Sequence, residues 1–285
     1  DGDADMADPG TTHKHGREHA GEGTPIRVVQ FSDLHLYREA DGRLLGQQTR
    51  RTLESVLMLA QRRHWPPSAI LLTGDLIHDA HEEGYRFLRQ RMERLAVPYF
   101  CVPGNHDRMD LLAGWVDPGC SSPLRVEPLD GWDLILLDST IPFEEGGHID
   151  SGVLAELEGY AESHPARPKL VCLHHQPTPV GSAWIDTMCV DNGDALLAAV
   201  ARHPSIRALA WGHVHQAFEA CWGDTLLLST PSTCVQFLPR SRDFGLDVLT
   251  PGYRWFDLYP DGRIETGIER TESYPEPLRL GPSGY

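Results

Sequence analysis

The sequence has little positive charge and no long apolar run. Lys and Arg number 25 against 41 Asp and Glu, which gives a formal net charge of −16. Proteins that bind nucleic acids or anionic membranes by electrostatic attraction need a basic surface, so this balance argues against both partners. No stretch reaches the ~18 consecutive apolar residues of a membrane span, and the N-terminus lacks the apolar segment of a signal peptide. An anionic substrate would then need local positive charge, which bound metal could provide.

Cysteine is scarce, and none of its spacings is Cys-x-x-Cys. Four of the six cysteines fall in apolar runs typical of strands. Cysteines of this kind are expected to be buried free thiols in a reducing cytoplasm rather than disulfides, so we predict a cytoplasmic protein. The six are Cys101, Cys120, Cys172, Cys189, Cys221 and Cys234.

The length and composition predict one domain behind a polar tail. Residues 1–24 are rich in Asp, Gly and Thr without apolar periodicity, which is typical of disorder. Their histidines, at 13, 15 and 19, could bind metal, but a disordered tail cannot preorganise a catalytic site. The remaining residues, 25–285, are numerous and apolar enough for a single large α/β domain.

Apolar periodicity predicts alternating strands and helices in the first half. Leu53, Val56, Leu57 and Ala60 recur at i, i+3, i+4 and i+7, the spacing of a helix with one buried face. Strand, helix, strand, helix, strand is the order of parallel βαβ units. In this half we expect strands at 26–31, 69–73 and 97–102, and helices at 48–64 and 82–95.

A loop or short-helix region should separate this half from the second, where strands and helices alternate again. The last strands are joined by turns such as Pro260-Asp261-Gly262, so the chain should finish in antiparallel hairpins. In this half we expect strands at 134–137, 169–173, 208–211, 218–222, 225–229, 253–259 and 263–268, and helices at 153–161 and 195–200.

Five short polar motifs follow apolar runs in this pattern. Open α/β sheets bind ligands at the carboxyl ends of their strands, so these five loops can share one rim. Gly104 allows backbone angles that other residues avoid, so the amide and imidazole after it can point at one place. The motifs are Asp33-Leu34-His35, Gly74-Asp75, Gly104-Asn105-His106-Asp107, His174-His175 and Gly212-His213-Val214-His215.

The chemistry of this set points to a pair of metal ions. Imidazole, carboxylate and one amide, without thiolate, suit Mn, Fe, Zn or Co. The groups are too many for one ion. Two ions about 3.5–4 Å apart, bridged by a carboxylate, stabilise both the attacking and the leaving oxygen of a phosphoryl displacement.

Each motif taken alone also has an ordinary structural explanation. Asp33-x-His35 could be a strand-end cap and a surface histidine, and Gly74-Asp75 a turn. His213 and His215 are harder to explain in this way. They are two residues apart, so on an extended segment both imidazoles lie on one face. Neighbours on a strand point to opposite faces, so spacing cannot choose between His174 and His175. We expect solvated side chains for the histidines at 64, 78, 81, 148, 164 and 203.

In this order the five motifs resemble those of the calcineurin-like metallophosphoesterases and span about two thirds of the chain. Further stretches resemble the bacterial class III 3′,5′-cyclic AMP phosphodiesterases, although Gln176 occupies a position where those sequences have another histidine, and residues before 24 lie outside the resemblance. These stretches are His174-His175-Gln176-Pro177, residues 182–186, residues 212–216, residues 230–237 and the closing Ser283-Gly284-Tyr285.

The resemblance implies an α/β fold, a four-layer αββα sandwich with two mixed β-sheets, and two divalent ions, iron or manganese. Asp75 would bridge the ions. The first ion would be held by Asp33, His35, Asp75 and His215. The second would be held by Asp75, Asn105, His174 and His213. His106 would be catalytic, and the substrate would contact His35, Asp75, Asn105, His106 and His215.

The implied activity is hydrolysis of 3′,5′-cyclic AMP to 5′-AMP by a metal-bridged hydroxide, which lowers cellular cyclic AMP. The alternative is the same chemistry on another small phosphodiester, a glycerophosphodiester or a 2′,3′-cyclic nucleotide. A non-catalytic scaffold of the same fold would have lost ligands, and here every motif residue is present. A DNA nuclease of this fold is opposed by the net charge of −16.

Overall fold

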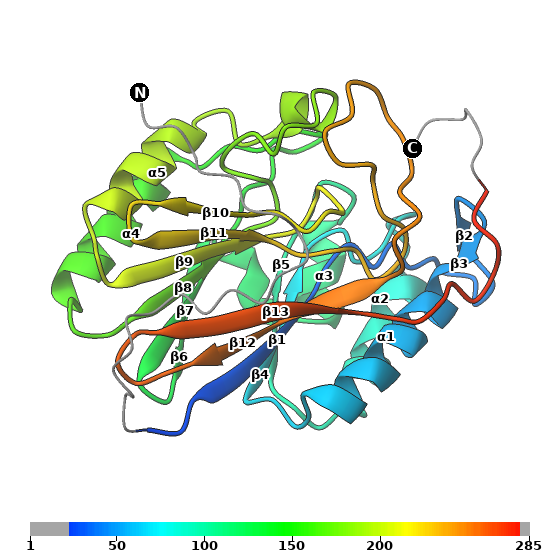
Figure 1. Cartoon of the computed structure of the whole chain (residues 1–285), viewed down its shortest axis with the longest axis horizontal. Helices are drawn as coiled ribbons and strands as arrows, with labels where there is room; N and C mark the ends of the chain where they lie inside the picture. Colours follow the sequence, from blue (N-terminus) through cyan, green and yellow to red (C-terminus); the bar gives the residue numbers. More distant parts are fainter. Residues whose placement is uncertain (1–22, 280–285) are drawn as a thin grey trace.

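The computed structural model describes residues 23–279, arranged as two β-sheets packed face to face between helices (Figure 1). The predicted N-terminal tail, apart from residues 23 and 24, lies outside the described residues, as does the Ser283-Gly284-Tyr285 ending. In Figure 1, α4 and α5 lie on one side of the two sheets and α1 and α2 on the other. The predicted αββα sandwich is therefore confirmed.

The first sheet has five strands. Its three N-terminal strands are parallel, as the βαβ pattern predicts, and the two C-terminal strands form the expected antiparallel hairpin beside β1. In spatial order the strands are β13 (Ile264–Arg270), β12 (Gly252–Leu258), β1 (Ile26–Phe31), β4 (Ala69–Thr73) and β5 (Tyr99–Val102).

The second sheet has six strands. Its four central strands are parallel, and its two edge strands run antiparallel to their neighbours, so both sheets are mixed. The order is β10 (Glu219–Trp222), β11 (Thr225–Ser229), β9 (Ile206–Trp211), β8 (Lys169–Cys172), β7 (Trp132–Leu137) and β6 (Leu124–Leu129). A short hairpin, β2 (Arg43–Leu44) with β3 (Gln47–Gln48), precedes the first helix.

The helices cover the outer faces of the sheets, and their buried residues follow the predicted periodicity. In α1 the buried side chains include Leu53, Val56, Leu57 and Ala60. Among the described residues no helix is long and apolar enough to cross a bilayer. The helices are α1 (Thr49–Arg63), α2 (Glu82–Glu93), α3 (Met109–Trp115), α4 (Ser151–Ser163) and α5 (Gly193–Ala201), with 3-10 turns η1 (Pro118–Ser121) and η2 (Ile185–Met188).

Three apolar cores correspond to the three interfaces between layers. Strand β4 shows the rule: Ile70 and Leu72 pack in the core under α1 and α2, while Leu71, on the other face, belongs to the core between the sheets, which also contains Leu170 of β8. A third core lies under α4 and α5. Both faces of β4 are covered, so the strand is apolar throughout instead of alternating.

Two histidines expected to be solvated are part of this packing instead. Nδ1 of His64 lies 2.7 Å from the Tyr253 hydroxyl, and its ring stacks on Trp255. His203 is only 9% exposed, with Nε2 3.5 Å from Glu158. Both follow a helix, and there the chain turns back onto the protein. The histidines at 81, 148 and 164 are exposed as expected.

Candidate metal centre

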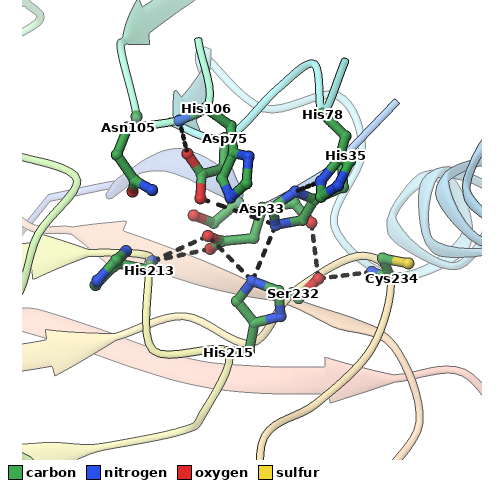
Figure 2. Close-up of polar contacts among 12 residues, drawn as sticks. Asp33, His35, Asp75, His78, Asn105, His106, His213, His215, Ser232 and Cys234 are labelled. Atoms are coloured by element: carbon green, nitrogen blue, oxygen red, sulfur yellow. Dashed lines mark hydrogen bonds and ion pairs between the residues drawn. The ribbon is translucent and has the colours of Figure 1, made fainter. Parts of the chain in front are cut away.

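The five polar motifs lie together where strands of both sheets end. Asp33 and His35 follow β1, Asp75 follows β4, Asn105 and His106 follow β5, His174 follows β8, and His213 and His215 follow β9. Figure 2 shows most of these side chains gathered around Asp33. All are buried except Asn105 and His106, which are partly exposed at the rim.

Five of the seven predicted ligand residues have left-handed backbone angles. Their φ values lie between 46° and 65°, a region uncommon for residues other than glycine. Such strain persists only where the surrounding structure enforces it, and it is concentrated at functional sites. The five are Asp33, His35, Asp75, His213 and His215.

The first predicted ligand set is brought together by the structure. Nε2 of His215 lies 3.4 Å from Asp33 Oδ1 and 3.1 Å from Nε2 of His35. Nε2 of His35 is also 3.9 Å from Asp75 Oδ2. Two ring nitrogens and two carboxylates therefore face a common point.

The second set also includes Asp75. Nε2 of His174 is 3.3 Å from Asp75 Oδ2 and 3.2 Å from Asn105 Oδ1. The ring of His213 lies 5.0 Å from that of His174, and its buried Nε2 has no hydrogen-bond partner within residues 23–279. A buried nitrogen left without a partner is costly unless it binds something, so the donor set fits a metal ion.

The choice between His174 and His175 follows from their directions. Nε2 of His174 points at Asp75, whereas His175 directs Nδ1 to the Ser139 hydroxyl, 2.9 Å away, and Nε2 to the Glu145 carbonyl at 3.1 Å. This geometry favours His174 as the ligand.

Backbone carbonyls orient two of the imidazoles. Nδ1 of His174 lies 2.8 Å from Thr73 O, and Nδ1 of His215 lies 2.8 Å from Val235 O. A ring that donates through Nδ1 presents a bare Nε2, as a metal requires. Both rings therefore direct Nε2 toward the carboxylates, where it can bind a cation once it carries no proton.

The charges of the cluster depend on one another. Burial alone would raise the pKa of Asp75, but the positive charge of His174 holds that pKa well below its usual range. In turn, burial opposes charge on His174, and Asp75 overcomes this and raises the pKa of His174 to about 9. Burial lowers the pKa of His35 and His213 well below the usual value, so both rings are neutral. A divalent cation would replace the His174 proton as the partner of Asp75.

Asp107 connects the loops that carry Asp75 and Asn105. The sequence placed it in a motif but indicated no role for it. Its carboxylate accepts the backbone N–H groups of Leu76, Ile77 and Gly104, at 3.0 to 3.2 Å. It fixes the distance between two ligand loops.

His78 corrects an expectation from the sequence, which placed this side chain in solvent. It is half-buried beside the cluster, with Nδ1 3.1 Å from Nδ1 of His35 and its ring stacked on that of His106. A signal existed: β1 and β4 pair with a constant offset of 41 residues, and Leu36 pairs with Ile77 at the same offset beyond the strand ends. His78 therefore had to lie beside the segment after β1.

A group of mostly buried histidines and aspartates, with one partly exposed asparagine, at the shared rim of two sheets fits a metal-dependent phosphoesterase. A family model described as calcineurin-like phosphoesterase matches residues 26–217. The chain belongs to this family, as its motifs predict.

Curated relatives extend over nearly the whole chain. The chain is 38% identical over 260 residues to the "3′,5′-cyclic adenosine monophosphate phosphodiesterase CpdA" of Pseudomonas aeruginosa, covering 91% of this chain and 95% of the relative. It is 33% identical to the protein of the same name from Escherichia coli K12, covering 88% and 91%. Among solved structures, a dimetal phosphatase from Danio rerio superposes with a TM-score of 0.61 at 15% identity, covering 88% of this chain and all of that one. This last likeness concerns the fold alone.

Proposed function

We propose that this protein is a metal-dependent phosphodiesterase that hydrolyses 3′,5′-cyclic AMP to 5′-AMP. The observation that carries the proposal is the cluster around Asp33 and Asp75, which offers two adjoining sets of nitrogen and oxygen donors. The choice of cyclic AMP rests on the relatives, which are named for that substrate and match about nine tenths of the chain.

Asp33, His35, Asp75 and His215 would hold one divalent ion, and Asp75, Asn105, His174 and His213 the other. Donors of this kind without thiolate suit iron or manganese. Two such ions supply a water of lowered pKa and positive charge beside the phosphorus. The two carboxylates contribute −2 against about +4 from two dications, so the site keeps an excess of positive charge for a phosphodiester anion.

His106 is placed to act on the substrate. Its backbone N–H donates to Asp75 Oδ1 at 3.0 Å, which fixes its loop, and its ring lies 5.1 Å from that of His35 at the partly exposed rim. During hydrolysis the bond between phosphorus and the 3′ oxygen breaks, and that oxygen takes up a proton. A rim imidazole can donate this proton or stabilise the charge on phosphorus.

The net charge of −16 supports a small cyclic nucleotide in preference to a nucleic acid. For the place of action we propose the cytoplasm. All six cysteines are free and four are buried, as suits a reducing compartment.

A substrate panel tests the proposal. Initial rates would be compared with Mn(II) or Fe(II) present, using 3′,5′-cyclic AMP, 2′,3′-cyclic AMP and glycerophosphocholine at equal concentrations. We expect 3′,5′-cyclic AMP to be turned over, with artificial diesters such as bis-p-nitrophenyl phosphate as further substrates. Rapid turnover of glycerophosphocholine beside an inert cyclic nucleotide would support the alternative substrate class instead.

A further inference from the structure

His78 contacts two residues of the proposed site without belonging to either ligand set. Its position is fixed by the backbone, because its N–H donates to the Leu36 carbonyl at 2.8 Å where Leu36 pairs with Ile77. Figure 2 shows its ring next to that of His35, on the side away from His213. The loop after β4 therefore carries the ligand Asp75 and, three residues later, a histidine directed at another ligand.

The contact between His35 and His78 joins two Nδ1 atoms 3.1 Å apart. A neutral imidazole carries one ring proton, so one nitrogen donates and the other accepts. Nε2 of His35 faces His215 Nε2 at 3.1 Å and must be bare to bind a cation. The proton of His35 is therefore on Nδ1, and Nδ1 of His78 accepts it.

This arrangement completes the pattern seen in the other ligands. His174 and His215 each direct Nδ1 to a backbone carbonyl at 2.8 Å, and His35 directs it to an imidazole. His78 also has a second contact that a carbonyl could not provide. Its ring stacks on that of His106, with centroids 4.7 Å apart and planes 21° from parallel.

We propose that His78 is a positioning residue that fixes the tautomer and orientation of His35 through Nδ1 and holds the ring of His106 by stacking. The inference rests on the proposed metal-dependent function. The two contacts should be separable, because an acceptor can be replaced without replacing a ring. Loss of the acceptor should weaken metal binding, while loss of the stack should lower kcat at saturating metal.

Two variants separate the contacts. His78→Asn places an amide oxygen where Nδ1 was but removes the ring, and His78→Leu removes both. For the metal-depleted chain, Mn(II) affinity would be measured by competition with a chelating dye, and kcat at saturating Mn(II). We expect His78→Leu to bind one of the two ions ~10–100-fold more weakly, the usual loss when a partner behind a ligand is removed. His78→Asn should bind close to the parent affinity, with kcat lowered in both variants.

His81→Leu is the matched control, because His81 is an exposed histidine in the same loop, and it should change neither quantity. Parent-like Mn(II) affinity in His78→Leu, or no recovery in His78→Asn, would overturn the inference. A third metal ion that the parent binds and His78→Leu does not bind would also overturn the inference, because His78 would then be a ligand.

Nitrogen NMR of the Zn(II)-loaded parent tests the inference without a variant. Nδ1 of His78 should be unprotonated, and a proton on that nitrogen would contradict the assignment. A parent that binds no metal contradicts the proposed function itself, and with it this inference.

Discussion

At the scale of single residues, Asp75 lies between the two ligand sets, 3.9 Å from His35 and 3.3 Å from His174. Asp75→Asn keeps the shape of the side chain but removes the charge that both sets share. Elemental analysis should find both ions lost, with affinity reduced by more than the ~10–100-fold of an outer partner. Asp150→Asn is the control, since Asp150 is an exposed carboxylate that caps α4 through the Gly152 N–H. Two ions retained in Asp75→Asn would show that Asp75 is not the bridge.

Substitution of His106 should give a different result from substitution of Asp75, because the neighbouring Asn105, and not His106, is the proposed metal ligand. His106→Ala should keep both metals while kcat for 3′,5′-cyclic AMP falls by about 10²-fold, as expected for one acid or oxyanion donor. The exposed His148→Ala serves as the comparison. Equal loss of kcat on bis-p-nitrophenyl phosphate, whose leaving group needs no proton, would assign His106 to charge stabilisation. Loss of metal would make it a ligand instead.

At the scale of elements, the loop after β5 is built on a glycine that allows two loops to touch. A Cβ at Gly104 would lie 2.2 Å from the backbone nitrogen and Oδ1 of Asp75. Gly104→Ala should therefore displace Asp75 and weaken metal binding by about tenfold or more. Gly159→Ala is matched, because nothing lies within 4 Å of that Cβ in the middle of α4. It should leave metal binding unchanged and stabilise the fold by about 0.5–1 kcal/mol. Parent-like metal affinity in Gly104→Ala would contradict the close contact.

The junction between α1 and β12 predicts a pH dependence of stability. Burial, with the nearby charge of Arg27, lowers the pKa of His64 to about 4 from an ordinary value near 6.5. Between these values the unfolded chain binds the proton and the folded chain does not. The free energy of unfolding should therefore fall as the pH drops from about 6.5 to about 4.

Urea denaturation at pH 7 and pH 5 measures this effect. His64→Asn retains an acceptor for the Tyr253 hydroxyl but cannot titrate, so its stability should fall less over that interval. We expect a difference on the order of 1 kcal/mol, because the half-buried ring is partly screened by water. His164→Asn, at an exposed histidine, should behave like the parent. If the free energy of unfolding depended equally on pH in the parent and in His64→Asn, the lowered pKa of His64 would be contradicted.

At the scale of the whole molecule, the sequence predicted most helices and strands because covered layers leave strong patterns. The run of apolar residues in β4 and the periodicity of α1 both follow from burial. Strand β6 was missed because Arg125, Glu127 and Pro128 interrupt its apolar pattern, which an edge strand tolerates. The division of the strands into two sheets came from the family resemblance, since no local pattern encodes which strands pair.

The candidate site was predictable to the extent that strand ends carry it. Each predicted ligand follows an apolar run, and the rule that such sheets bind ligands at their strand ends predicted that the five motifs could share one rim. The contacts of His78 with the rings of His35 and His106, and of Asp107 with backbone N–H groups, follow from no motif chemistry, and so they required coordinates. The choice of His174 over His175 likewise depends on side-chain direction, which neighbouring residues on a strand leave open.

The central claim is that this buried cluster hydrolyses a cyclic phosphodiester with two metal ions. The most direct test is to titrate the metal-depleted chain with Mn(II) in the presence of 3′,5′-cyclic AMP and to identify the product by chromatography. We predict no turnover without metal, full activity at two Mn(II) per chain and 5′-AMP as the product. Turnover by the metal-free chain, full activity at a single ion, or 3′-AMP as the product would contradict the account.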